Sequence, residues 1–234
     1  WNVRVSECIK EMIKSHLESA IRLVRNYAGK NPGWTQDSAA VLNVAECVRK
    51  VSAEDLGVIQ SEYVSRRDRY IEYINVGECE DLTMCVFILP PLSRIPLHDH
   101  PQMTVFSKVL WGDLEIESYD LIKPVDTFGR ALGKSNPKTR LKTAEVAVTY
   151  RDKSNVHTFL AHEWTAVFDI LVPPYDVAHG RPCHYFSDPS NISSSTNQSS
   201  EDSKTVVLRE AACPDWFHTV RGEYRGSNIG LNVD

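Results

Sequence analysis

No stretch of the sequence stays apolar over the length that a bilayer requires. One of the longest apolar runs, TAVFDILVPPY from Thr165, contains Asp169 and prolines and is much shorter than the roughly 20 residues of a membrane-spanning helix. The first residues, WNVRVSECIKEMIK, lack the apolar core and the small-residue cleavage site of a secretory signal. We therefore expect a protein that does not associate with membranes and that resides in the cytoplasm, with the nucleus as a second compartment.

The chain also lacks a CxxC pair and an excess of basic residues. Its 26 basic residues are outnumbered by 31 acidic ones, and the net charge is -5. A nucleic-acid-binding protein needs a basic surface to neutralise phosphates, so we expect no nucleic-acid partner. The cysteines are scattered and suit the reduced thiols of a cytosolic protein better than a disulfide framework. They are Cys8, Cys47, Cys79, Cys85, Cys183 and Cys213.

The spacing of apolar residues predicts helices first and strands afterwards. Apolar residues recur at helical spacing from Val5 to Val24, a second helix is expected from Ser38 to Lys50 with Asp37 as its N-cap, and Ser52 to Asp55 is typical of the start of a short helix. From about Arg69 apolar and polar residues alternate instead, which predicts antiparallel strands. The strand segments are RYIEYINV, DLTMCVFIL, MTVFSKVL, DLEIESYDL, AEVAVTY and TAVFDILV. This order indicates an α+β chain, mainly β, whose helices cover one outer face of a sandwich or barrel.

We expect a single monomeric domain over 1–234, because all-β barrels and sandwiches commonly reach this size as one unit. We divide it into a helical N-terminal cover (1–60), a β core (69–186), a Ser-rich segment (187–204) and C-terminal strands (205–234). The Ser-rich segment, SDPSNISSSTNQSSEDSK, is almost free of apolar residues. We therefore expect a mobile surface loop there.

Two histidines stand one residue apart in the segment IPLHDHPQMTVFSKVLWG, which begins at Ile95. Alternate residues of a strand point to the same face, so His98 and His100 are expected to project together while Asp99 points the other way. The two imidazoles can bind one metal ion. They can also be two polar residues near a barrel mouth, and the pair alone does not decide between these interpretations.

The spacing after this pair resembles the first motif of the cupins, H-x-H-(x3-4)-E-(x6)-G. Gly112 occupies the position of the motif's glycine, in an expected hairpin turn, but Thr104 and Val105 stand where its glutamate would be. A site without that carboxylate has neutral nitrogen donors. This suits Fe(II) with a thiol substrate, because the thiolate then supplies the negative charge.

A third ligand must come from a later strand. His157 in SNVHTF lies at an expected strand start, where a second cupin motif would place its histidine. We prefer it to His162 in LAHEW, whose neighbours indicate a hairpin turn. His16 and His218 are assigned surface or packing roles.

Four separated motifs together resemble the thiol dioxygenase family of plant cysteine oxidases and animal cysteamine (2-aminoethanethiol) dioxygenases. The motifs are IPLHDHPQMTVFSKVLWGDLEIESYD, NVHTF, FDILVPPYD and GRPCHYF. The resemblance implies a cupin-type double-stranded β-helix, which is a jelly-roll barrel, with the N-terminal helices packed on the outside. It also implies that His98, His100 and His157 hold Fe(II).

The resemblance assigns further residues to the surroundings of this site. Asp169 and Tyr175 match acidic and phenolic groups of the family, although Asp169 can instead satisfy loop amides and Tyr175 can be a packed loop aromatic. An Asp within an apolar strand is costly unless it is paired, which favours the role beside the metal. Cys183 and Tyr185 match the pair that can form a thioether cross-link in the animal enzymes. This chain shares the Cys-His-Tyr sequence of those enzymes. The alternative is a buried thiol beside a packed ring, and His184 between them is expected to face solvent.

The implied reaction adds both atoms of O2 to the sulfur of an aminothiol and yields a sulfinic acid. The implied substrates are cysteamine and the N-terminal cysteine of a peptide or protein, with oxygen sensing as a role. An enzyme for free cysteine would be expected to hold the α-carboxylate with a well-placed Arg. Arg94, Arg181 and Lys108 are the candidates, and none has a clear inward position. The rival interpretation is a cupin-type module that binds a metal without turnover.

Overall fold

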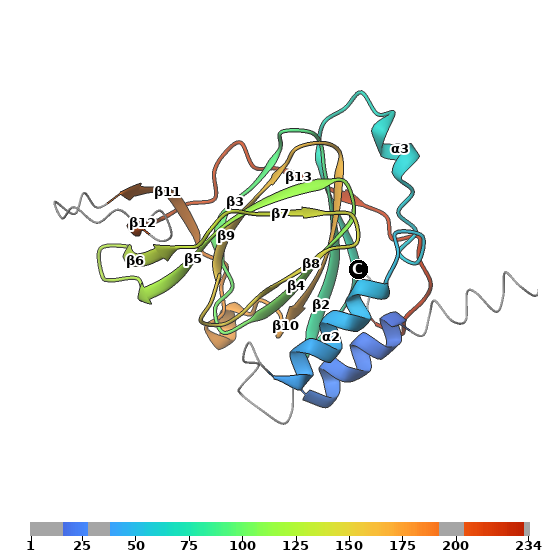
Figure 1. The fold of residues 1–234 in the computed structure, drawn as a ribbon, viewed down its shortest axis with the longest axis horizontal. Helices are drawn as coiled ribbons and strands as arrows, with labels where there is room; N and C mark the ends of the chain where they lie inside the picture. The colour runs from blue at the N-terminus through green and yellow to red at the C-terminus, as the bar shows by residue number, and fades with distance from the viewer. Residues whose placement is uncertain (1–15, 28–37, 192–203, 232–234) are drawn as a thin grey trace, which may run out of the picture.

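The structure, a computed structural model, describes residues 16–27, 38–191 and 204–231 as two facing sheets with helices on one side (Figure 1). Residues 16–27 are helical, and they are followed by α2 (Ala39–Lys50), α3 (Gln60–Val64) and, late in the chain, a short 3-10 helix at Val177–His179. One sheet has the order β13 (Thr219–Gly222), β1 (Ile71–Cys79), β2 (Leu82–Leu89), β10 (Thr165–Val172), β4 (Thr104–Trp111) and β8 (Val146–Thr149). The other has the order β6 (Arg130–Ser135), β12 (Thr205–Ala211), β11 (Tyr185–Asn191), β3 (Arg94–Asp99), β9 (Val156–Ala161), β5 (Asp113–Lys123) and β7 (Thr139–Lys142).

From β2 to β5 successive strands alternate between the two sheets, so the two sheets form a single barrel. β2 and β4 belong to the six-stranded sheet, whereas β3 and β5 belong to the seven-stranded sheet. Neighbouring strands are antiparallel, except that β13, at the edge of the six-stranded sheet, joins β1 in parallel. This is the double-stranded β-helix that the motifs imply, and the predicted fold class is confirmed.

The central strands of the six-stranded sheet are buried on both faces, which explains their largely apolar sequences. Every residue of β4 and β10 is buried. On β10, Phe168 and Ile170 pack against the helices, while Val167 and Leu171 face the barrel interior. The helix at 16–27 and α2 lie side by side over the outer face of this sheet (Figure 1). The predicted helical cover is therefore present within the described residues.

Gly112 connects the two sheets rather than closing a hairpin, so that part of the prediction is wrong. It lies between the end of β4 and the start of β5, which belong to different sheets. Its φ is 104°, and an added Cβ would lie 2.5 Å from the Trp164 carbonyl oxygen. Only glycine combines this backbone conformation with such a close approach.

The helix boundaries differ from the prediction in detail. Ser38, not Asp37, caps α2, and its Oγ accepts from the Val41 N–H at 3.3 Å. Residues 52–55 lie in an irregular turn, where Ser52 and Asp55 bond to each other, and the short helix begins only at Gln60. The part of the first predicted helix before residue 16 lies outside the described residues. In the described part of the chain, no helix is both long and apolar enough to cross a membrane.

The Ser-rich segment begins as a strand, which polarity alone did not reveal. β11 continues through Ser187 to Asn191 because its backbone pairs with β12. Residues 192–203 lie outside the described part. β6, β11 and β12 extend the seven-stranded sheet beyond the barrel (Figure 1).

Candidate metal centre

Three histidines meet inside the barrel. His98 on β3 is paired in register with His157 on β9, and His100 follows the end of β3. One ring nitrogen of each lies within 4.8 Å of the other two, and the Nε2 atoms of His100 and His157 are 3.2 Å apart. Two imidazole nitrogens that bind one metal ion at about 2.1 Å and at a right angle lie about 3 Å apart. The separation between His100 and His157 therefore suits a shared ion.

Each of these imidazoles has an oxygen next to its Nδ1. His98 Nδ1 is 2.8 Å from the Pro96 carbonyl oxygen, and His157 Nδ1 is 3.1 Å from Thr149 Oγ1. An Nδ1–H that donates to such an oxygen leaves Nε2 unprotonated and able to bind a metal.

His100 follows the same pattern through a phenol. Its Nδ1 is 2.7 Å from the Tyr175 hydroxyl, and that hydroxyl donates to the Asp99 carbonyl oxygen at 2.6 Å. The phenolic oxygen is thus free to accept from His100 Nδ1–H. Three neutral imidazoles with their Nε2 lone pairs turned to one region are the donor set expected of a metal site.

Burial keeps these donors neutral. It lowers the pKa of His98, and it lowers the pKa of His100 and His157 well below the ordinary histidine value. For His100 and His157 the charge of a neighbouring imidazolium lowers the pKa further. The cluster can therefore bind a cation near neutral pH without first losing protons.

Asn155, which the sequence did not single out, fixes the backbone at His100. Its Oδ1 accepts from the His100 N–H at 3.2 Å, and its Nδ2 donates to the His100 carbonyl oxygen at 2.8 Å. The same Nδ2 lies 3.0 Å from the Tyr150 carbonyl oxygen. A residue just before β9 thus holds His100, which lies outside β3, in place.

A cavity of about 220 Å³ opens beside the histidines. Its wall is largely apolar and aromatic, with a few polar groups. Besides the three histidines, the lining residues are Tyr73, Glu78, Thr83, Cys85, Phe87, Ile95, Phe159, Asp169, Leu171 and Tyr175. Most of those on β1 and β2 carry no sequence motif, and the pairing of these strands brings them to the site.

Asp169 lies in the middle of β10, and its carboxylate lines this cavity. Its neighbours across the sheet are Cys85 on β2 and Ser107 on β4. Burial raises the pKa of Asp169 to about 7, and a hydrogen bond with Ser107 partly opposes this rise. Oδ1 is buried without a hydrogen-bond partner. The structure thus places a carboxyl group with unused bonding capacity in the cavity wall.

Tyr175, Cys183 and Tyr185 lie together at one side of the histidines. Cys183 is near enough to both Tyr175 and Tyr185 for their hydroxyls to affect the pKa of its thiol, and Tyr185 pairs with His98 across β11 and β3. His184 does not simply face solvent, as the sequence suggested. Its Nδ1 is 2.9 Å from an oxygen of the buried Asp99 carboxylate. This pair ties the start of β11 to β3.

The remaining candidate histidine and cations are not among the residues that line the cavity. His162 contacts Glu115 on β5 at 3.1 Å. Lys108 points toward the helices and donates to the Arg49 carbonyl oxygen at the end of α2. Arg181 bonds to the Pro174 carbonyl oxygen, and Arg94 is exposed on β3. None of the described residues that line the cavity is Lys or Arg.

Comparison with known proteins bears on this geometry. The family model PCO_ADO matches residues 42–229. The chain belongs to this family. Plant cysteine oxidase 2 of Arabidopsis thaliana is 34% identical over 59% of this chain and 54% of its own length. Plant cysteine oxidase 1 of the same plant is 31% identical over 87% of this chain and 76% of its own length.

PCO_ADO relatives also occur in animals. The 2-aminoethanethiol dioxygenase of Mus musculus is 27% identical over 86% of this chain and 88% of its own length. The resemblance to plant cysteine oxidases and animal 2-aminoethanethiol dioxygenases that the motifs indicate is therefore confirmed. In a PCO_ADO protein, the three-histidine cluster implies a bound metal ion.

Proposed function

We propose that this protein is an Fe(II)-dependent thiol dioxygenase. The observation that carries the proposal is the cluster of His98, His100 and His157, whose neutral rings turn Nε2 toward one region in a family of thiol oxidases and dioxygenases. An all-imidazole donor set suits Fe(II), which when bound supplies a position for the thiolate and the redox chemistry that O2 requires. The reaction, RSH + O2 → RSO2H, needs no other reductant.

The protein's own groups orient the substrate and exclude water. Phe87, Phe159 and Leu171 supply the apolar wall next to the histidines, and Phe159 stacks on His157 with ring centroids 4.8 Å apart. A small aminothiol would displace water from this wall when its sulfur lies beside the three Nε2 atoms. Asp169 is available to accept a hydrogen bond from the substrate's amine.

The charges of the cavity favour an amine without a free carboxylate. Asp169 and Glu78 are its acidic lining residues, and no basic residue lines it among those described. An ammonium group beside Asp169 would favour the carboxylate form of that residue, whereas the α-carboxylate of free cysteine would meet repulsion and no Arg. We infer that the substrates are cysteamine or the N-terminal cysteine of a peptide or protein. The latter would make the protein an oxygen sensor, and the scattered cysteines support a reducing compartment such as the cytoplasm or nucleus.

Turnover of three thiols tests this proposal. The protein is loaded with Fe(II) and incubated in air with cysteamine, a Cys-initiated peptide or free cysteine, and the products are read by mass spectrometry. We expect a mass gain of two oxygens on cysteamine or the peptide, and a kcat/KM for free cysteine at least about tenfold lower, because the loss of one charge-assisted contact costs more than about 1.4 kcal/mol. Comparable kcat/KM values for free cysteine and the peptide would contradict the substrate assignment. Metal binding without any oxidation would support the non-catalytic module instead.

We also propose a thioether between Cys183 and Tyr185. The Cys183 thiol and the Tyr185 phenol influence each other's ionisation, which supports a position of Sγ near the phenol. Joining Sγ to the ring carbon beside the hydroxyl removes two hydrogens, which O2 can accept. The product is resistant to thiol reductants and lowers the mass of the chain by two hydrogens. If no thioether forms after extended turnover, Cys183 and Tyr185 are instead a buried thiol packed beside an aromatic ring.

A further inference from the structure

Cys183 has a second thiol beside it that the proposed function does not use. Tyr185 pairs with Ala211 and Phe186 with Glu210 in the antiparallel β11–β12 ladder. Continuing this register by two residues, beyond the end of the ladder, places Cys183 opposite Cys213. Directly opposed residues of antiparallel strands have Cα atoms about 4.5–5.5 Å apart, which is within the range that a disulfide bridges.

The side-chain contacts agree with this register. Both Cys183 and Cys213 lie near enough to Tyr185 to raise the pKa of its hydroxyl, and the two thiols are close enough to influence each other's ionisation. Each cysteine is followed in the chain by a backbone hydrogen-bond donor with a partner. The His184 N–H donates to Asp99 at 2.8 Å, and the Phe217 N–H donates to the Pro214 carbonyl oxygen at 2.9 Å.

The two thiols differ in access and reactivity. Cys213 is exposed, whereas Cys183 is partly buried, and burial raises the pKa of Cys183 to about 11. An exposed thiol reacts first with an oxidant in solution, and a protonated, shielded thiol reacts only when its partner is already activated.

We propose that Cys183 and Cys213 form a reversible disulfide by exchange with a small disulfide such as cystamine, the disulfide of cysteamine. The Cys213 thiolate attacks RSSR, which forms Cys213–S–SR and releases RSH. Cys183 then attacks the Cys213 sulfur, loses its proton to water and releases the second RSH, so the two electrons pass from the protein thiols to RSSR. This bond and the thioether exclude each other, because both consume the Cys183 sulfur.

The disulfide would act near the metal centre. Cys183 also lies near enough to Tyr175 to raise the pKa of its hydroxyl, and that hydroxyl contacts His100 Nδ1. Drawing Sγ toward Cys213 would move it away from Tyr175. Oxidation of small thiols to disulfides would in this way change the surroundings of Tyr175, whose hydroxyl orients the metal ligand His100.

Peptide mass spectrometry tests the linkage without any turnover. The full chain is incubated with cystamine, its free thiols are alkylated, and a digest is compared with and without dithiothreitol. We expect a peptide containing Cys183 joined to one containing Cys213, lost on reduction. Cys213→Ser should abolish it and leave Cys183 alkylated, whereas the matched control Cys47→Ser should keep it.

If the isolated protein already carries the thioether, its Cys183 cannot form a disulfide, and the variant Tyr185→Phe is used instead. This variant has no phenol to react, so its Cys183 thiol stays available, and the linked peptide should form in it in any case. Cysteamine retained on Cys213 beside a free Cys183 in Tyr185→Phe would overturn the proposal. So would a disulfide from Cys213 to any other cysteine.

Discussion

At the scale of single residues, the metal centre depends on the oxygen atom that the Nδ1 of each imidazole contacts. Pro96, Thr149 and Tyr175 each present an oxygen to an Nδ1 atom, so the protein selects one tautomer at all three histidines. The oxygen partners come from three separate segments of the chain. The ligands are therefore held by the closed barrel rather than by any one motif.

Removal of one ligand should remove the metal. We expect wild type to bind about one iron per chain and His157→Ala to lose most of it, because the remaining two imidazoles form a much weaker site. His162→Ala is the matched control, since His162 contacts Glu115 outside the cavity. Iron is measured per folded chain after gel filtration. Equal iron content in His157→Ala and wild type would contradict the assignment.

Asp169 should make the stability of the metal-free protein depend on pH. Its pKa is about 7 in the folded chain against 3.8 for an unperturbed Asp, so the folded state binds more protons between these values. Wild-type stability should fall as the pH rises from about 4 to about 7, by on the order of 2 to 4 kcal/mol, and then level off. Asp169→Asn should remove this fall, while turnover drops about 10- to 100-fold. Parallel pH profiles of urea unfolding for the two proteins would contradict the buried carboxyl.

The sequence predicts the ligands of this site better than its walls. His98, His100 and His157 lie in short motifs whose spacing reflects strand alternation. Tyr73 and Cys85 reach the cavity only because β1 and β2 pair in one register beside β10. Asn155 reaches His100 across 55 residues of chain, and no local pattern carries that information.

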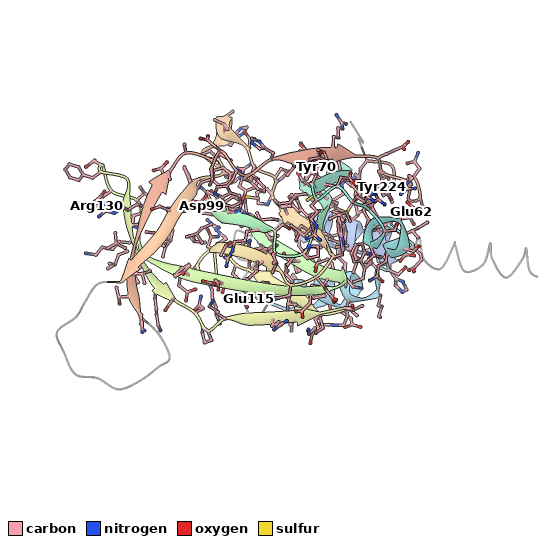
Figure 2. The ribbon with its side chains drawn as sticks, turned by 90° about the horizontal axis from the view of Figure 1, so that it is seen from above. Glu62, Tyr70, Asp99, Glu115, Arg130 and Tyr224 are labelled. Carbon is pink, nitrogen blue, oxygen red and sulfur yellow. The ribbon has the colours of Figure 1, made fainter. Side chains whose placement is uncertain are left out.

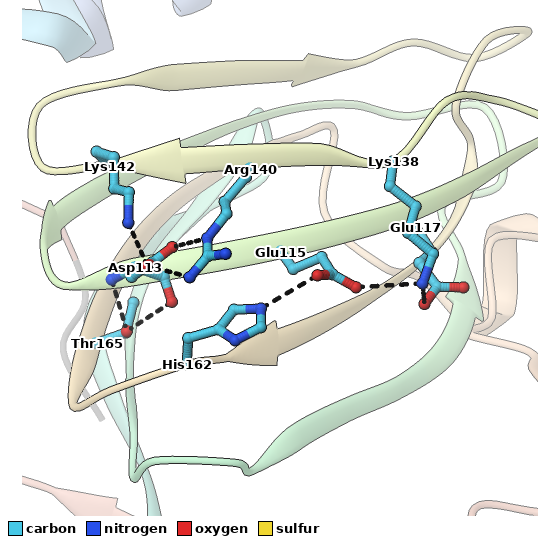
Figure 3. A network of polar contacts seen from close by, with 8 residues as sticks. All are labelled: Asp113, Glu115, Glu117, Lys138, Arg140, Lys142, His162 and Thr165. Atoms are coloured by element: carbon cyan, nitrogen blue, oxygen red, sulfur yellow. Dashed lines mark hydrogen bonds and ion pairs between the residues drawn. The ribbon is translucent and has the colours of Figure 1, made fainter.

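At the scale of elements, a polar network joins β5, β7 and the turn before β10 (Figure 3). The buried Asp113 carboxylate accepts from Arg140 Nε and Nη2 at 2.7 and 2.6 Å, and it also contacts Lys142. The Asp113 backbone N–H donates to Thr165 Oγ1 at 3.1 Å. The two hydrogen bonds from Arg140 hold the pKa of Asp113 well below its ordinary value.

This network predicts a loss of stability in acid. Because the folded pKa of Asp113 is depressed, its contribution is complete above the ordinary pKa of about 4 and is lost as the pH falls below it. Asp113→Asn should lower the free energy of unfolding by about 1–3 kcal/mol at pH 7 and by much less near pH 2. Lys138→Ala is the control, because this exposed lysine pairs with Glu115 and Glu117 at the surface, and its loss should cost about 0–1 kcal/mol. Urea unfolding at both pH values measures the difference.

The strands that the sequence predicted are those that burial of apolar residues holds in place, whereas β7 of this network was not predicted. β2, β4, β5 and β10 alternate or remain apolar because the barrel interior and the helices bury them. β7, with the sequence TRLK, buries only Leu141, and polar contacts hold it to β5. A strand that is held mainly by backbone hydrogen bonds to its neighbour and by one carboxylate shows little alternation of apolar and polar residues in its sequence.

At the scale of the whole molecule, the last described strand returns to the helical cover. β13 pairs with β1, and the residues after it run beside the segment that joins α2 and α3. Arg225 bonds to Glu62 of α3 at 2.6 Å, and Figure 2 shows Tyr224 next to Glu62, at the end of the molecule opposite Arg130. β1 carries Tyr73 of the cavity wall, so this contact supports the site from outside.

Gly57, between α2 and α3, packs closely against the C-terminal segment. Its φ is 67°, and an added Cβ would lie 2.4 Å from the backbone carbon of Arg225. Gly57→Ala should therefore combine the strain of a left-handed alanine with a backbone clash, and lower the free energy of unfolding by about 2–5 kcal/mol. Gly180→Ala isolates the first contribution, because Gly180 has nearly the same φ, 71°, with nothing within 4 Å of an added Cβ. It should cost only about 1–2 kcal/mol. If urea unfolding shows equal losses for the two variants, the close contact at Arg225 does not hold the cover to the barrel.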